Sequence, residues 1–358
     1  MKTCRLIAFL LIATALFSSS CCSNEEKEAS KKAKNVIVLI GDGMGPAQVY
    51  SLILTSQEET AFERFPYSGF SITKSASNEI TDSAAGGTAI AVGKKTKNNM
   101  VGMTPDSIPV PSMLEMFAER GKKTGVVVTC SVTHATPADF IAHNIARGNN
   151  EEIALEIANK PILNVLFGGG KKYFTERKDG LDLISKMWDN GWNIYDSLSQ
   201  IEDNSARTMV LTCRKHMVKA PERGNFLPEA TAKAIEMLDN ENGFFLMVEG
   251  SQIDFACHDN DSTTLVEEMK DFNNTLNVVL DFAEKDGNTL VVVTADHETG
   301  GLTFIDPQGK YTRTDFKWST GSHSAIFVPV FSFGPGAEKF SGIMDNTEII
   351  SKIMEIAQ

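Results

Sequence analysis

The sequence predicts an α/β protein, built as a three-layer sandwich with a largely parallel central sheet. From residue 35 to the C-terminus, short apolar runs rich in β-branched residues alternate with helical patterns, as in βαβ units. The runs are continuous and do not alternate between apolar and polar residues. Each strand is therefore expected to be buried on both faces, which is typical of a parallel sheet.

The expected elements follow one another without an internal repeat. The first strand covers residues 35–40 and leads through a glycine-rich turn into a helix from Pro46 to about Ser56. Further strands are expected at residues 124–129, 162–167, 243–248, 289–294 and 326–331. Further helices are expected at residues 111–121, 137–147, 151–159, 181–189, 227–238, 261–284 and 346–357.

Length and composition bound the possible partners. A chain of 358 residues that is 42% hydrophobic can bury a large core. No linker interrupts residues 35–358, so they are expected to form a single domain. The formal net charge of -12 argues against a nucleic-acid partner. It does not argue against a phosphate substrate, because bound cations would supply the local positive charge.

The first 21 residues have the composition of a secretory signal peptide. Lys2 and Arg5 precede an apolar stretch at residues 6–17, which is too short to span a bilayer. Small residues before Cys21 resemble a bacterial lipoprotein cleavage site, so we expect an exported protein with lipid on Cys21. The alternative is cleavage nearby and a soluble periplasmic protein. Residues 22–34 are polar and are expected to form a tether.

Cysteines are sparse in the rest of the chain, and their spacing does not suggest a disulfide framework. A bridge between Cys130 and Cys213 is possible, but the sequence does not establish it.

Acidic residues and histidines fall near expected strand ends, where parallel sheets bind their ligands. Asp42 follows the first strand, Glu249 follows the strand at residues 243–248, and Asp296 and His297 follow the strand at residues 289–294. His323 precedes the strand at residues 326–331. Carboxylate and imidazole together suit zinc, whereas a carboxylate alone suits a harder cation such as magnesium.

Two further features strengthen the metal interpretation. Asp254 and His258 are four positions apart and would share one face of a helix, although a helix start with solvated acids is the alternative. Ser83 stands between Asp82 and a run of small residues, so it is expected at a helix N-terminus, which favours an anion. An isolated serine there would be an ordinary capping residue, but a serine hydroxyl beside two cations is a nucleophile.

Thr136 and Arg147 are weaker candidates. Thr136 precedes Pro137 and would cap a helix, while its hydroxyl can also complete a hard-cation site. Arg147, expected on that helix, can bind two phosphate oxygens or remain a solvated charge. His143 and His216 have no motif around them and are expected to be structural or surface residues.

Together these stretches resemble the alkaline phosphatases. The matching segments are residues 40–45, 81–89, 93–95, 134–137, 248–250, 253–254, 295–301 and 323. The resemblance implies an alkaline-phosphatase-like fold with two zinc ions and one magnesium ion. It implies the following ligands: Asp254, His258 and His323 for one zinc; Asp42, Asp296, His297 and Ser83 for the other; Asp42, Thr136 and Glu249 for magnesium.

The resemblance also implies an activity. Ser83 would attack small phosphate monoesters and form a phosphoserine intermediate, with Arg147 holding the phosphate. The products would be inorganic phosphate and an alcohol, and a homodimer is a candidate assembly. The alternatives are a phosphodiesterase of the same superfamily and a lipoprotein that binds metal or phosphate without turnover.

Two positions beside these ligands vary within the family. His134 stands where some members have aspartate and others histidine. Phe255 stands where members carry lysine, histidine or tryptophan. Because a phenyl ring makes no hydrogen bond to phosphate, we expect weaker product inhibition than in a relative with lysine. The spacer from His297 to His323 is short, and it leaves little room for the inserted crown-like domain of larger relatives.

Overall fold

The structure is a computed structural model that describes residues 32–204, 207–309 and 315–358. The predicted signal peptide, the lipid attachment at Cys21 and nearly all of the tether lie outside the described residues and stay predictions. Within the described ranges, every helix is too short or too polar to cross a bilayer.

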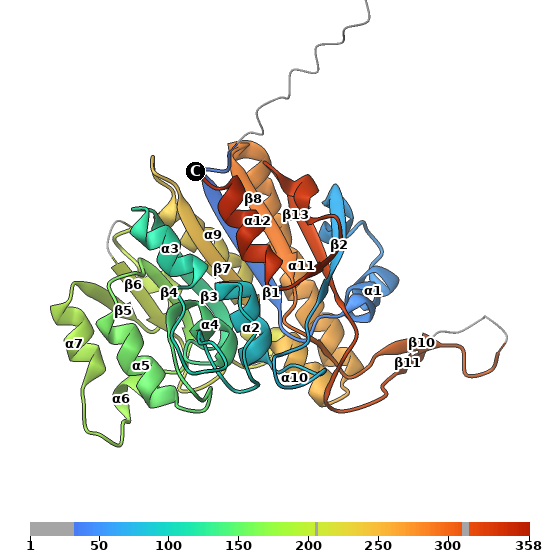
Figure 1. The fold of residues 1–358 in the computed structure, drawn as a ribbon, viewed down its shortest axis with the longest axis horizontal. Coiled ribbons are helices and arrows are strands. Elements are labelled where there is room, and N and C mark those ends of the chain that lie inside the picture. The colour runs from blue at the N-terminus through green and yellow to red at the C-terminus, as the bar shows by residue number, and fades with distance from the viewer. Residues whose placement is uncertain (1–31, 205–206, 310–314) are drawn as a thin grey trace, which may run out of the picture.

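A ten-stranded sheet forms the centre of the molecule (Figure 1). Its strands are β1 (Asn35–Gly41), β2 (Tyr67–Ile72), β3 (Lys123–Ser131), β4 (Val165–Gly169), β5 (Trp192–Tyr195), β6 (Arg207–Leu211), β7 (Phe244–Gly250), β8 (Thr289–Thr294), β13 (Val328–Phe333) and β14 (Gly342–Asp345). They lie in the order β14-β2-β13-β8-β1-β7-β3-β4-β6-β5. Only β13 runs antiparallel to its neighbours, so the predicted largely parallel sheet is confirmed.

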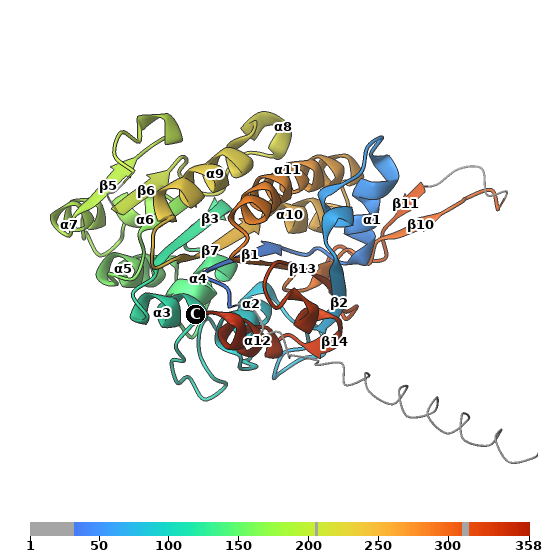
Figure 2. The ribbon, with the colours of Figure 1, turned by 90° about the horizontal axis from the view of Figure 1, so that it is seen from above.

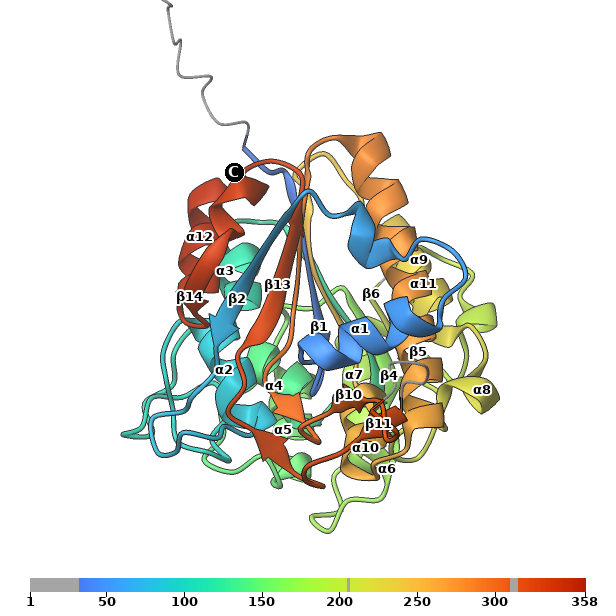
Figure 3. The same ribbon diagram turned by 90° about the vertical axis from the view of Figure 1, so that its right-hand side faces the viewer.

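Helices cover both faces of the sheet (Figures 2 and 3). One face carries α2 (Ser83–Val92), α3 (Met113–Glu119), α4 (Ala135–Ile141), α5 (Asn150–Asn159), α6 (Lys172–Thr175), α7 (Leu183–Asp189) and α12 (Glu348–Ile356). The other carries α1 (Pro46–Thr55), α9 (Phe226–Leu238), α10 (Gln252–His258) and α11 (Ser262–Asp286), with α8 (Ala220–Arg223) packed on α11.

The two apolar cores explain why the strands are continuous hydrophobic runs in the sequence. In β1, Val36, Val38 and Ile40 face one core, whereas Ile37 and Leu39 face the other. Side chains of a strand point alternately to its two faces, so a strand buried on both sides needs apolar residues throughout. The three-layer architecture predicted from the sequence follows from this double burial.

The sequence analysis missed the outer strands. The burial of β2 alternates, and its buried positions include Gly69 and Ser71 rather than large apolar residues. Strands β5 and β14 have only four residues each. Two small ribbons were also missed: β10 (Thr303–Ile305) with β11 (Asp315–Lys317), and β9 (Glu298–Thr299) with β12 (His323–Ser324). Three short 3-10 turns complete the elements: η1 (Ala61–Arg64), η2 (Leu198–Gln200) and η3 (Ala337–Phe340).

Two expectations about local structure are corrected. The helix expected at residues 137–147 ends at Ile141, because Ala142 is extended and Asn144 exchanges two backbone hydrogen bonds with Val101. Arg147 therefore lies in a turn and not on a helix. The possible disulfide between Cys130 and Cys213 is not formed, since both thiols are free.

A buried ion pair joins α8 to α11. The Arg223 guanidinium donates to Glu268 at 2.6 Å and to Asp271 at 2.7 Å. All three side chains are almost inaccessible, at 3%, 2% and 6% exposure. Removing the arginine would leave two carboxylates buried without a counter-charge. We expect Arg223→Met to lower the free energy of unfolding by about 3–5 kcal/mol in urea denaturation.

A surface pair provides the control. Arg214 donates to Glu176 at 2.6 Å, but these side chains are 64% and 48% exposed. Solvent screens such a pair, so Arg214→Met is expected to leave the free energy of unfolding nearly unchanged. Equal losses in the two variants would contradict a special role for the buried pair.

Candidate active site

The candidate ligands lie together because four strands are neighbours in the order β8-β1-β7-β3. Asp296 follows β8, Asp42 follows β1, Glu249 lies near the end of β7, and Thr136 comes shortly after β3. The four strands are parallel, so their carboxyl ends meet at one edge of the sheet. The structure therefore places Asp42, Glu249, Asp296 and Thr136 together at that edge.

A sharp turn after β1 directs Asp42 into the site. Gly43 has a φ of +73°, which favours glycine. A Cβ atom there would lie 2.8 Å from Thr299 Oγ1 and 2.9 Å from Asp254 Oδ1. The backbone N–H of Gly43 donates to Asp296 Oδ1 at 3.2 Å. Glycine is therefore required at this position both by the backbone and by the space around it.

Ser83 is the first residue of α2, as predicted. Asp82 caps the helix by accepting the N–H of Ala85 at 3.0 Å. Two glycines bring α2 close to the other ligands. A Cβ on Gly86 would lie 2.5 Å from the Asp296 carbonyl oxygen, and one on Gly87 would lie 2.2 Å from an Asp139 carboxylate oxygen. The small residues after Ser83 thus allow the helix to approach the sheet edge.

His297 links the serine to two carboxylates. Its Nε2 lies 3.1 Å from Ser83 Oγ, 3.2 Å from Asp296 Oδ2 and 3.5 Å from Asp42 Oδ1. Its Nδ1 lies 3.1 Å from Thr299 Oγ1. That hydroxyl donates its own proton to Asp254 at 2.6 Å, so the ring must donate at Nδ1. The Nε2 lone pair then faces two carboxylates, an arrangement that needs a cation between them.

Asp254, His258 and His323 form the second part of the site. The Nε2 atoms of the two histidines are 3.2 Å apart, and they lie 3.4 Å and 3.8 Å from the Asp254 carboxylate. Each Nδ1 donates to a backbone carbonyl oxygen at 2.8 Å, which turns both Nε2 atoms inward. Asp254 and His258 share a face of α10, as their spacing predicted.

His323 reaches this group through the short β9–β12 ribbon. In its register His323 lies opposite Thr299, two residues after His297. The rings of His323 and His297 stack with their centroids 3.6 Å apart. A pairing of only two residues thus brings a distant loop histidine into the site.

The buried carboxylates of the site favour a bound positive charge. Burial raises the pKa of Asp42 well above its usual value, and the negative charges of Asp296, Asp254 and Glu249 raise it further. Burial also raises the pKa of Glu249 to about 7. Burial alone would raise the pKa of Asp254 too, but the hydrogen bond from His258 and the nearby imidazoles hold it well below its ordinary value.

Several buried oxygens have no hydrogen-bond partner. They are both carboxylate oxygens of Asp42, Asp296 Oδ2, Glu249 Oε1 and Thr136 Oγ1. Unpaired buried carboxylates cost free energy, which a bound cation would offset. The donors therefore fit metal ions. The expected capping role of Thr136 is wrong, because it lies inside α4 and His134 is the N-cap residue.

Three groups of described residues are compact enough to share an ion. They are Asp42, Asp296 and His297; Asp254, His297 and His323; and Cys130, His134 and Glu249. In each group the ligand atoms lie within 4.8 Å of one another. The first two consist of predicted zinc ligands, but they share His297 and do not include His258. The third contains a cysteine that the sequence analysis considered only for a disulfide.

Arg147 lies beside the N-terminus of α2. Its guanidinium is 3.3 Å from Asp82 Oδ2 and 3.2 Å from His134 Nε2. Its backbone N–H donates to the Asn99 carbonyl at 2.7 Å. Asp82 immediately precedes Ser83, so the guanidinium is anchored next to the serine rather than solvated as a free surface charge.

One neighbour of the site was not expected. The ring of His216 lies 5.4 Å from that of His134 and 5.2 Å from that of Phe255, and its Nδ1 accepts the Ser131 N–H at 3.2 Å. No spacing pattern connects His216 with the other site residues. Its place follows from the contact with Ser131, which is distant in the sequence.

Comparisons with known proteins agree with this site. The family model described as alkaline phosphatase matches residues 33–312. Alkaline phosphatase 4 of Bacillus subtilis is 32% identical, across 99% of this chain and 97% of the relative. The solved alkaline phosphatase of the Antarctic bacterium TAB5 is 42% identical, with a TM-score of 0.87 across 91% of this chain and 98% of that one. A cold-active alkaline phosphatase of Shewanella is 31% identical, with a TM-score of 0.83 across 90% of this chain and 100% of that one. The chain therefore belongs to the alkaline phosphatase family.

Proposed function

We propose that this chain hydrolyses phosphate monoesters through a phosphoserine intermediate on Ser83. The observation that carries the proposal is the position of Ser83 Oγ, 3.1 Å from the inward-facing Nε2 of His297. The same nitrogen faces Asp42 and Asp296, so an ion bound there would contact the serine. Membership of the alkaline phosphatase family supports phosphate monoesters as the substrate class.

We assign two zinc ions and one magnesium ion to the site. One zinc would be held by Asp254, His258 and His323. The other would be held by Asp42, Asp296 and His297, with Ser83. Magnesium would be held by Asp42, Thr136 and Glu249, whose unpartnered oxygens support the assignment. A solved variant of the TAB5 enzyme, with aspartate in place of one histidine, is described with Mg bound in a site called M3.

The residues of the chain then have distinct tasks. Bound zinc would lower the pKa of the Ser83 hydroxyl and offset phosphate charge. Ser83 Oγ releases its proton to solvent and forms a bond to phosphorus as the ester oxygen leaves with its electron pair and takes up a proton to give the alcohol. A water oxygen later displaces Ser83 Oγ, which regains a proton, and phosphate is released. Thr299 keeps His297 in the tautomer whose Nε2 faces the serine. Arg147, held by Asp82, binds two phosphate oxygens.

The alternatives named from the sequence are not favoured. Arg147 and the third cation suit the extra charge of a monoester better than a diester. A protein that only binds metal or phosphate would not need a buried serine hydroxyl among ligand atoms. Export, lipid attachment and a homodimer stay predictions.

The first test is removal of the nucleophile. Wild type should hydrolyse an aryl phosphate at alkaline pH with zinc and magnesium, and EDTA should abolish turnover. Ser83→Ala should lower kcat by about a thousandfold or more, because the proposed attacking oxygen is removed. Ser351→Ala, an exposed change on α12, is the matched control. Absence of turnover in folded, zinc-loaded wild type would contradict the proposal, and diesters would be tested next.

The second test uses the metal-free protein. The folded-state pKa of Glu249 is about 7, against an ordinary value of 4.5. The folded state therefore binds more protons between these values, and this carboxyl lowers stability as pH rises through that window. In EDTA, the urea midpoint should fall between about pH 5 and about pH 8. This fall should be larger in wild type than in Glu249→Gln.

Added zinc and magnesium should reverse the loss in wild type. Equal pH dependence of the midpoints in wild type and Glu249→Gln would show that Glu249 does not carry this effect.

The third test concerns product inhibition. The Phe255 ring packs edge-on against the rings of His134 and His216 and offers no polar atom to phosphate. Phe255→Lys should tighten inhibition by inorganic phosphate by about tenfold, which corresponds to one added charge-assisted hydrogen bond. Phe255→Leu removes the ring without adding charge and should leave the inhibition constant nearly unchanged. An unchanged constant in Phe255→Lys would refute this explanation.

A further inference from the structure

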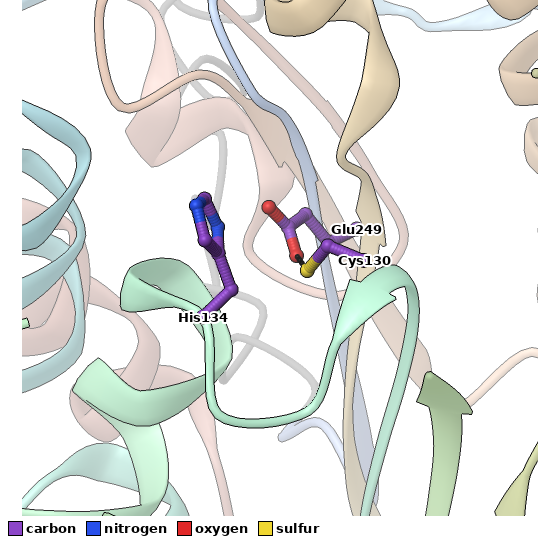
Figure 4. Close-up of side chains that lie close together, drawn as sticks. All are labelled: Cys130, His134 and Glu249. Carbon is purple, nitrogen blue, oxygen red and sulfur yellow. Dashed lines mark hydrogen bonds between the residues drawn. The ribbon is translucent and has the colours of Figure 1, made fainter. Parts of the chain in front are cut away.

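A thiol lies inside the ligand cluster, at the edge of the predicted magnesium site. Cys130 comes from the end of β3, His134 from the N-terminus of α4, and Glu249 from the end of β7 (Figure 4). Strands β3 and β7 pair in parallel with Val128 opposite Glu249. This register brings the Cys130 side chain, two residues further on, beside the carboxylate.

The cysteine and the glutamate are both completely buried. Cys130 Sγ lies 3.4 Å from Glu249 Oε2 and 3.2 Å from the Ser131 carbonyl oxygen. Burial raises the pKa of this thiol well above its usual value, and the charge of Glu249 adds to the effect. Without a metal ion, the neutral thiol therefore donates weakly to the carboxylate or to the carbonyl.

Two polar atoms of this group have no hydrogen-bond partner of their own. They are Glu249 Oε1 and His134 Nδ1, and both are buried. Figure 4 shows the His134 ring facing the carboxylate and the sulfur. The three ligand atoms lie within 4.8 Å of one another. Such separations are compatible with one shared ion at roughly the 2.0–2.3 Å that zinc keeps from nitrogen and sulfur.

The donor types determine which ion fits. Magnesium prefers oxygen ligands in an octahedral arrangement, whereas thiolate and imidazole favour zinc and other borderline cations. We propose that Cys130 Sγ, His134 Nδ1 and Glu249 together bind a zinc ion, which competes with magnesium for Glu249. The competition rests on the proposed magnesium site, but the binding of a cation to the thiol does not.

The protons can be followed through this step. Binding converts the Cys130 thiol to a thiolate and releases its proton to solvent. Arg147 can only donate, so His134 accepts its hydrogen bond at Nε2 and carries its own proton on Nδ1. An ion at Nδ1 requires that proton to move to Nε2. Arg147 then loses its acceptor on His134 while it keeps Asp82.

Cobalt(II) provides a spectroscopic test that needs no substrate. The full chain, freed of metal and titrated with Co²⁺, should develop the near-ultraviolet charge-transfer band of a cobalt–thiolate bond. The proposed zinc sites contain no sulfur, so they give no such band. Cys130→Ser should abolish the band and reduce bound zinc by one equivalent, measured by mass spectrometry. Cys213 is a half-buried cysteine outside the ligand cluster. The Cys213→Ser variant should keep the band and the full amount of bound zinc.

The outcomes separate the parts of the proposal. Wild type that binds cobalt without a thiolate band overturns it, as does a band that survives Cys130→Ser. If Cys130→Ser fails to fold, His134→Gln provides the second variant, and it should move the band to higher Co²⁺ concentration.

A large excess of magnesium should weaken the band in wild type. A band indifferent to magnesium would overturn the sharing of Glu249. Because no turnover is measured, these results are independent of the proposed phosphatase activity.

Discussion

The site depends on one constraint, the burial of carboxylates at the ends of adjacent parallel strands. Asp42, Glu249 and Asp296 come from three neighbouring strands and are inaccessible to solvent. Burial and mutual repulsion raise the free-energy cost of ionising these carboxyl groups. The elevated pKa values of Asp42 and Glu249 reflect this cost. A protein interior does not keep such a group without counter-charge. The surrounding imidazoles, hydroxyls and glycines can all be understood as arrangements that let cations enter.

The parts around the carboxylates are coupled rather than independent. Thr299 donates to Asp254 and accepts from His297, so one hydroxyl orients ligands in both halves of the site. The same residue excludes a side chain at Gly43 and lies opposite His323 in the β9–β12 ribbon. Outer partners of this kind hold ligating nitrogens in place before an ion arrives. They also explain why the turn after β1 cannot vary without disturbing the histidines.

Much of this arrangement could be predicted from the sequence because it depends on strand ends. The buried strands are continuous apolar runs, and a ligand directly after such a run, such as Asp42, needs no tertiary information to be located. Arg147 was misplaced because backbone pairing between Asn144 and Val101 overrides the helical pattern. His216 was missed because its place depends on a contact with residues far away in the sequence. Strand β2, which lies between the edge strand β14 and β13, was missed because it is only partly buried.

His134 occupies the position where two functions meet. Through Nε2 it accepts from Arg147, the residue assigned to phosphate, and through Nδ1 it faces Cys130 and Glu249. Burial and the positive charge of Arg147 lower the pKa of His134 to about 3, so the ring stays neutral and holds a single proton. That proton can occupy only one nitrogen at a time. Whatever binds at Nδ1 therefore determines whether Arg147 is held back by His134 or is free to turn toward a phosphate beside Ser83.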